Sequence, residues 1–124
     1  MSDRKKLLIV DDSKFSRVLI RGIVQVLRPG WEIAEAANGE DALQLALSDV
    51  FDFASVDINM PGMDGLELTV RFREECPQLR VCLVSANVQE ESRRRAQELN
   101  AGFVRKPITS DSIRESIHYF ETPK

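Results

Sequence analysis

Five polar side chains of this sequence combine types and spacing that could do chemistry. Asp11 and Asp12 are adjacent carboxylates, and Asp57 is a third carboxylate further along the chain. Ser85 offers a hydroxyl group and Lys106 an ammonium group. Three carboxylates held in one place would raise one another's pKa, and a hard cation such as Mg²⁺ would relieve that conflict. A metal ion, a further cation and a carboxylate nucleophile together meet the requirements of phosphoryl transfer.

Apolar runs of strand type precede these positions, and helical patterns separate the runs. The strand-like runs cover residues 6–10, 31–36, 51–56, 80–84 and 103–105. Helical patterns follow them at about 15–27, 42–47, 66–75, 89–99 and 110–120. Strands that alternate with helices predict a parallel sheet with helices on both faces. We therefore expect one α/β domain over residues 1–124, a doubly wound (βα) unit repeated five times.

The predicted sheet brings together polar groups that are far apart in the chain. Ligands of open parallel sheets bind beyond the carboxyl ends of the strands, at the point where the strand order reverses. In the flavodoxin-like order 2-1-3-4-5, the runs 6–10 and 51–56 are neighbours at that point. The three aspartates would then converge at one cleft, flanked by the hydroxyl and the ammonium group.

The segment after the third strand-like run carries two expectations. Residues 57–65 are expected to form a long loop, in which Gly62 and Gly65 supply positive φ. Asp57 is the preferred nucleophile candidate, because it begins this flexible loop while the aspartate pair after the first run is fixed.

The first helical pattern is bounded by recognisable start and stop signals. Asp12 or Ser13 can cap its N-terminus, and Pro29-Gly30 ends it. The residues at helical spacing predict a stripe that faces the sheet. That stripe contains Phe15, Val18, Leu19, Gly22, Ile23, Val26 and Leu27.

Composition excludes several classes of function. The net charge of the 124-residue chain is −3 and its pI is about 5.2, whereas a nucleic-acid-binding domain is expected to be basic. No apolar run approaches the roughly 20 residues of a membrane span, and the first apolar run is too short for a signal peptide. Two cysteines do not make a disulfide framework. We expect a cytoplasmic protein with no nucleic-acid or membrane partner.

Four short segments, in this order, resemble the receiver domain of two-component response regulators. They are VDD at 10–12, VDINMPGMDG at 56–65, VSA at 84–86 and FVRKP at 103–107. The resemblance extends over nearly the whole chain and suggests a stand-alone regulator similar to those of chemotaxis. The strand order used above is a known feature of this family, so it is not independent of the resemblance.

The resemblance implies a phosphorylation site. Asp57 would accept a phosphoryl group from a phosphohistidine, on a sensor histidine kinase or a phosphotransfer protein. Asp12, Asp57 and the backbone carbonyl of Asn59 would bind Mg²⁺, and Asp11 would act through a water molecule. Ser85 and Lys106 would hold the phosphoryl oxygens.

The resemblance also implies how the signal leaves the site. Phe103 occupies the aromatic switch position and would rotate inward when Ser85 moves. The bond between Lys106 and Pro107 would be cis. The face formed by the fourth helix, fifth strand and fifth helix would change and control an unknown downstream protein.

Residues beside the site would tune its chemistry. Asn59 and Asn87 flank the phosphoacceptor and are expected to set the lifetime of the phosphoryl group. Ser85 stands where threonine is also common in the family. We expect the protein to act as a monomer or as a phosphorylation-dependent dimer.

Other classes of function have weaker support. A haloacid-dehalogenase-like phosphatase also uses an aspartate nucleophile, a lysine and Mg²⁺, but its second acid lies two residues after the nucleophile, where this chain has Asn59. A nucleotide or flavin binder would need a glycine-rich motif that is absent. We therefore expect no enzyme beyond self-phosphorylation and self-dephosphorylation. The chain ends soon after its last helix, which suits either a regulator without an output domain or a piece cut from a longer protein.

Overall fold

The structure is a computed structural model that describes residues 4–86 and 89–122. Within these ranges five strands form one parallel sheet in the order β2-β1-β3-β4-β5. This order confirms the predicted flavodoxin-like fold. The strands are β1 (Lys6–Val10), β2 (Glu32–Ala36), β3 (Phe53–Asp57), β4 (Arg80–Ser85) and β5 (Gly102–Arg105).

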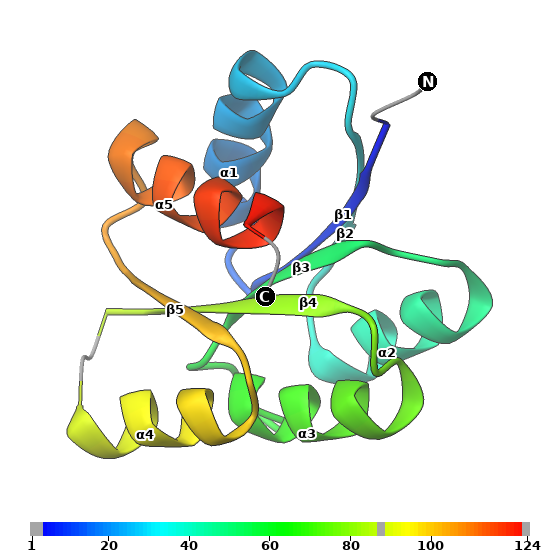
Figure 1. The fold of residues 1–124 in the computed structure, drawn as a ribbon, viewed down its shortest axis with the longest axis vertical. Helices are drawn as coiled ribbons and strands as arrows, with labels where there is room; N and C mark the ends of the chain where they lie inside the picture. The colour runs from blue at the N-terminus through cyan, green and yellow to red at the C-terminus, as the bar shows by residue number, and fades with distance from the viewer. Residues whose placement is uncertain (1–3, 87–88, 123–124) are drawn as a thin grey trace.

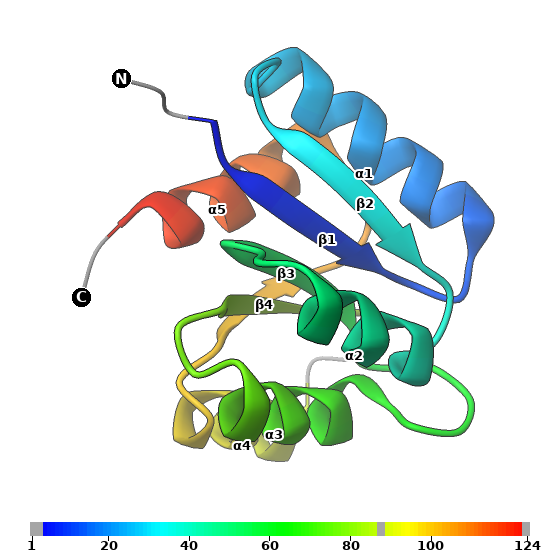
Figure 2. The same ribbon diagram turned by 90° about the vertical axis from the view of Figure 1, so that its right-hand side faces the viewer.

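Helices cover both faces of the sheet, so the molecule has three layers (Figures 1 and 2). One face is covered by α1 and α5, and the other by α2, α3 and α4. None of the helices in the described ranges is both long and apolar enough to cross a lipid bilayer. The helices are α1 (Lys14–Leu27), α2 (Gly39–Ser48), α3 (Gly65–Glu75), α4 (Glu90–Glu98) and α5 (Ser110–Glu121).

Strand β1 is buried on both faces and supports the residues that follow it. Leu7 and Ile9 pack into the apolar cluster beneath α1 and α5, whereas Leu8 and Val10 pack into the cluster beneath α2 and α3. This alternation follows from the two-residue period of a strand. All four side chains are at most 1% exposed. The end of β1 is therefore held rigidly from both sides.

The carboxyl ends of β3 and β4 extend one residue further than the apolar runs predicted. Asp57 lies opposite Val84 in the ladder, and Ser85 lies opposite Arg105. Asp57 is thus the last residue of a strand, and the expectation that it begins a flexible loop is wrong. The ladder continues past the apolar run because its hydrogen bonds are made by the backbone and do not depend on side-chain polarity.

Helix α1 is rotated relative to the apolar stripe that its spacing predicted. Ile20 and Val24 are 3% and 2% exposed and pack against the sheet, whereas Phe15, Val18 and Val26 are 72%, 54% and 79% exposed. The predicted stripe is therefore wrong at these three positions and at Gly22, which is also exposed. Apolar residues occur on several sides of this helix, so spacing alone could not identify the buried side.

Two valines of α1 give a matched test of this orientation. Val24→Ala should lower the free energy of unfolding by about 2 kcal/mol, because it removes two buried methyl groups and leaves a cavity. Val26→Ala should change it by less than about 0.5 kcal/mol, because the side chain is exposed. Urea unfolding at equilibrium measures both. Equal losses would contradict the orientation of α1.

Candidate functional site

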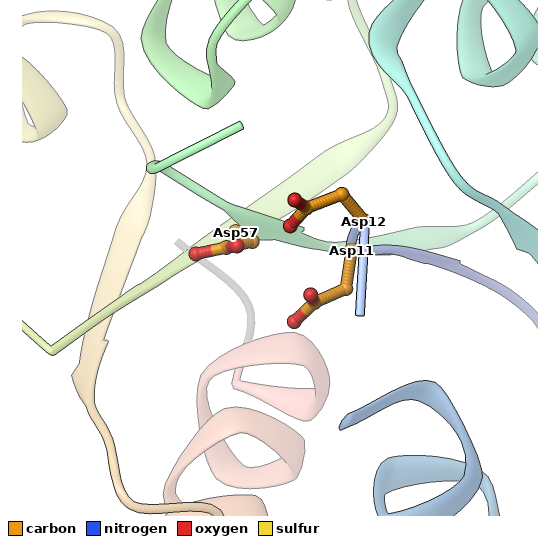
Figure 3. Close-up of side chains that lie close together, drawn as sticks. All are labelled: Asp11, Asp12 and Asp57. Atoms are coloured by element: carbon orange, nitrogen blue, oxygen red, sulfur yellow. The ribbon is translucent and has the colours of Figure 1, made fainter. Parts of the chain in front are cut away.

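Three carboxylates meet beyond the carboxyl ends of β1 and β3. Oxygen atoms of Asp11, Asp12 and Asp57 all lie within 4.8 Å of one another, and Figure 3 shows the three side chains gathered in one place. Asp11 and Asp57 are buried, at 1% and 4% exposure, while Asp12 is exposed. An oxygen-only donor set that is partly open to solvent suits Mg²⁺, which keeps several of its waters.

The strand register produces this convergence. Strands β1 and β3 are parallel neighbours, and Val10 lies opposite Val56. The residues that follow this pair therefore lie at the same level, and they are Asp11, directly after β1, and Asp57, the last residue of β3. The site thus forms from residues 46 positions apart by backbone pairing alone.

The backbone around Asp11 is fixed by three hydrogen bonds. The Asp11 N–H donates to the carbonyl of Ala36 at 3.2 Å, and the Ser13 N–H donates to Asp11 Oδ1 at 2.9 Å. Arg17 Nη1 donates to the Asp11 carbonyl oxygen at 2.7 Å. Ser13, one of the two predicted caps, is the N-cap of α1, because its side chain accepts from the N–H of Ser16. The carboxylate pair therefore sits in a defined turn.

Asp57 is held by the segment that follows it. The Asn59 N–H donates to Asp57 Oδ1 at 3.3 Å, and the Gly65 N–H donates to the carbonyl of Ile58 at 2.9 Å. A Cβ atom at Gly65 would collide with the carbonyl oxygen of Asp57. Of the two glycines expected to adopt positive φ, only Gly62 does so, at φ +74°. Gly65 is needed instead for the close approach of α3 to the end of β3.

Lys106 contributes a positive charge between two of the carboxylates. Its Nζ lies 3.6 Å from Asp11 Oδ2 and 3.7 Å from Asp57 Oδ1. The backbone N–H of Lys106 donates to the carbonyl of Ser85 at 3.0 Å. The bond between Lys106 and Pro107 is cis, as the family resemblance implied.

The predicted hydroxyl and switch residues lie around the same edge of the sheet. Ser85 is 1% exposed, and its Oγ accepts a hydrogen bond from Asn59 Nδ2 at 3.4 Å. Phe103 of β5 is partly buried, and the guanidinium of Arg93 in α4 lies 5.5 Å from its ring centroid. Asn87 lies outside the described residues. The roles assigned to these side chains, and the Asn59 carbonyl as a ligand, remain predictions.

Burial and repulsion shift the ionisation of Asp57. Burial, followed by the charge of Asp11, raises the pKa of Asp57 from 3.8 to about 6. Lys106 and the Asn59 N–H oppose that increase, and Asp12 adds to it. The site therefore holds less positive charge than its carboxylates require. A divalent cation bound by the three acids would supply the missing charge.

Two contributors to the site were not identified from the sequence. Arg17 contacts the Asp11 carbonyl from α1, and no motif marks such a residue. Its spacing of four residues from Arg21 is a signal for a shared partner on one face of the helix, but it does not reveal which partner. The sequence also did not show that Gly65 permits a close approach to the backbone, because that depends on α3 beginning directly against the end of β3.

The fold and the acidic site define a receiver module of two-component signalling. The chain belongs to this family, because the family model named response regulator receiver domain matches residues 7–118 of the sequence. Domains of this family take part in phosphorylation-dependent signalling, bind Mg²⁺ through an acidic cluster, and interact with sensor histidine kinases and phosphotransfer proteins.

The similarity to several short proteins extends over almost the whole chain. The chemotaxis protein CheY of Pseudomonas aeruginosa is 37% identical, over 90% of this chain and 92% of that protein. Sporulation initiation phosphotransferase F of Bacillus subtilis is 31% identical, over 91% of this chain and 90% of that protein. The structure of CheY4 from Vibrio cholerae is similar with a TM-score of 0.83 at 26% identity, over 94% of this chain and 98% of that one.

Larger proteins contain a similar segment. The sensor protein EvgS of Escherichia coli is 30% identical over 92% of this chain, but this chain spans only 9% of its length. The sensor histidine kinase RcsC of Salmonella typhi is 32% identical, and the chain spans 12% of it. Receiver domains similar to this one thus occur both in short regulators and within long sensor proteins.

The raised pKa of Asp57 predicts how stability depends on pH without divalent cations. Between pH 4 and 7 the contribution of Asp57 to the free energy of unfolding should fall as pH rises, because folded Asp57 keeps its proton up to about pH 6 while the unfolded chain loses it near pH 3.8. Asp57→Asn removes this contribution. The variant should exceed the wild type by about 3 kcal/mol at pH 7, with the difference closing towards pH 4.

Urea unfolding in the presence of a chelator, repeated across this range, measures that difference. Comparing the two proteins cancels the contributions of the titrating groups that do not interact with Asp57. A difference that does not vary with pH would contradict the raised pKa.

Proposed function

We propose that this protein is a phosphorylation-dependent switch whose phosphoacceptor is Asp57. An ionised Oδ of Asp57 attacks the phosphorus of a phosphohistidine. The bond between phosphorus and the imidazole nitrogen breaks, and the electron pair stays on the imidazole. The observation that supports this proposal is the convergence of Asp11, Asp12 and Asp57 beside the ammonium group of Lys106.

The acidic residues would hold Mg²⁺ at this site. Asp12, Asp57 and the carbonyl of Asn59 are proposed as ligands, with Asp11 acting through water. Bound Mg²⁺ supplies positive charge that keeps Asp57 ionised and neutralises the phosphoryl oxygens. Lys106 adds charge from the other side and is close enough to reach an oxygen of a phosphoryl group on Asp57.

Ser85 and Phe103 are proposed to transmit the change. The Ser85 hydroxyl lies at the end of the strand next to β3 and can donate to a phosphoryl oxygen on Asp57. Movement of Ser85 would leave space for Phe103 to rotate inward, away from Arg93 of α4. The face formed by α4, β5 and α5 would then differ between the two states. A downstream protein that prefers one state would bias the equilibrium between them.

Helix α1 offers a surface for the phosphodonor. Phe15 and Val18 are exposed apolar side chains on α1, which begins directly after the Asp11–Asp12 turn. A histidine-bearing domain of a kinase or phosphotransfer protein that buries these side chains would bring its phosphohistidine to Asp57. We propose this as the docking position of the donor.

The protein is proposed to act in the cytoplasm as a switch that does not turn over a separate substrate. Its two cysteines are free thiols, and Cys82 is fully buried, as suits a reducing compartment. The position two residues after the nucleophile is Asn59, whose amide cannot act as the general acid that a phosphatase of this type needs.

Incubation with Mg²⁺ and acetyl phosphate tests the proposed function. We expect one acid-stable, base-labile phosphoryl group per chain, because an acyl phosphate on Asp57 has that reactivity. Asp57→Asn should abolish the adduct and remain folded. Intact mass spectrometry measures the adduct, and circular dichroism confirms the fold. Labelling of Asp57→Asn at the same position, or multiple turnover on a generic phosphate ester, would contradict the proposal.

Lys106→Ala tests the coupling between phosphorylation and the α4–β5–α5 face. At saturating Mg²⁺ the variant should still be labelled, but the phosphate-induced shifts of amide resonances in β5 and α4 should shrink, because no ammonium group draws the phosphoryl group towards β5. Arg105→Ala is the matched control, since its side chain is exposed and lies one residue away. Wild-type shifts in Lys106→Ala would exclude Lys106 as the coupling residue.

A further inference from the structure

Arg17 connects the acidic turn to the edge of the sheet through two different nitrogen atoms. Its Nη1 donates to the carbonyl oxygen of Asp11 at 2.7 Å. Its Nε donates to Oε1 of Glu35, the next-to-last residue of β2, at 3.0 Å. The Arg17 side chain is only 15% exposed. A planar guanidinium with several fixed donors can make both bonds at once, which a lysine ammonium on a flexible stem cannot do in the same geometry.

Arg21 provides an internal comparison one helical turn later. Its Nε donates to the other oxygen of Glu35, Oε2, at 2.6 Å, and its Nη2 donates to the carbonyl of Ile33 at 3.3 Å. Hydrogen bonds from Arg21 and then from Arg17 hold the pKa of Glu35 below its usual range. Both arginines therefore anchor Glu35, but only Arg17 also donates to Asp11, whereas the second contact of Arg21 is to Ile33.

The Asp11–Asp12 turn needs such an anchor. Three carboxylates within 4.8 Å repel one another, and Asp12 is exposed, so it could turn away into solvent. The carbonyl of Asp11 belongs to the peptide unit that leads into Asp12. A donor that fixes this carbonyl fixes the plane of that peptide and the position of the Asp12 Cα atom, and it thereby restricts the directions in which the Asp12 side chain can leave the backbone.

We propose that Arg17 is a positioning residue for the Mg²⁺ site: by tying the Asp11 carbonyl to Glu35 of β2, its guanidinium holds Asp12 in the orientation that binds the metal ion. This inference rests on the proposed function, because it assumes that the three carboxylates bind Mg²⁺. Arg17 does not contact the metal or the phosphoryl group itself. It acts through the backbone of the turn.

Electrostatics and positioning predict opposite effects for the loss of Arg17. A positive charge near a cation site weakens binding, so its removal should strengthen Mg²⁺ binding if charge alone matters. Loss of the anchor should weaken binding, because the turn must be ordered each time the ion binds. Substitutions of groups that orient metal ligands commonly weaken metal binding about 10- to 100-fold.

The test compares Arg17→Lys with Arg21→Lys. Each variant keeps the charge and disturbs one of the two contacts to Glu35, but only Arg17→Lys loses the bridge to Asp11. Isothermal titration calorimetry with Mg²⁺ alone should show about tenfold weaker binding for Arg17→Lys. Arg21→Lys should stay within about twofold of the wild type. Urea unfolding should show similar stability for the two variants, which excludes unfolding as the cause.

Two further measurements separate positioning from a general structural role. The amide resonance of Asp12 should shift in Arg17→Lys without Mg²⁺, but not in Arg21→Lys. Labelling of Asp57 by acetyl phosphate in Arg17→Lys should recover at high Mg²⁺ concentration, because the defect is in affinity. Arg17→Met should also bind Mg²⁺ more weakly than the wild type, against the electrostatic expectation.

The outcomes distinguish this inference from the proposed function. Wild-type Mg²⁺ affinity in Arg17→Lys, equal weakening in both lysine variants, or stronger binding in Arg17→Met would overturn the positioning role. These results would leave the phosphorylation of Asp57 untouched. Absence of Mg²⁺ binding and of labelling in the wild type would instead overturn the proposed function, and the inference with it.

Discussion

The central constraint in this structure is that strand pairing holds carboxylates together although they repel one another. Parallel pairing of β1 with β3 places Asp11 and Asp57 at the same level, where both are buried. Neither residue can move away without disturbing a strand that is packed on both faces. Lys106 opposes this repulsion with one positive charge, and the Mg²⁺ ion proposed for this site would oppose it further.

The surrounding elements divide into those that hold the site and those that can change. Strands β1, β3 and β4 are buried and fix the acids and Ser85. Helix α4 buries only Ala96 of its nine residues, so its position costs less to alter than that of a helix with a broad apolar face. Phe103 lies between these two regions and contacts Arg93 of α4. This arrangement suits a protein in which a change of charge at the acidic site alters the surface formed by α4 and β5.

Much of the fold and of the site could be predicted from the sequence, and the failures have physical causes. The alternation of strands and helices predicted the sheet, and the rule for strand ends predicted that Asp57 and Lys106 would meet. The buried side of α1 could not be chosen, since apolar residues occur around much of that helix. The Arg17 bridge needs the register of β2, in which Glu35 lies opposite Ile9, and no local pattern provides that register.

The most direct test is a carbon-detected NMR titration of the aspartate carboxyl groups, first without divalent cations and then with saturating Mg²⁺. We expect Asp57 to titrate near pH 6 in the first experiment. Its titration should move below the range of an ordinary aspartate in the second, because the ion favours the charged form. An Asp57 carboxyl that titrates near its usual value in the absence of the ion, and does not respond to Mg²⁺, would show that repulsion between the carboxylates does not control this site.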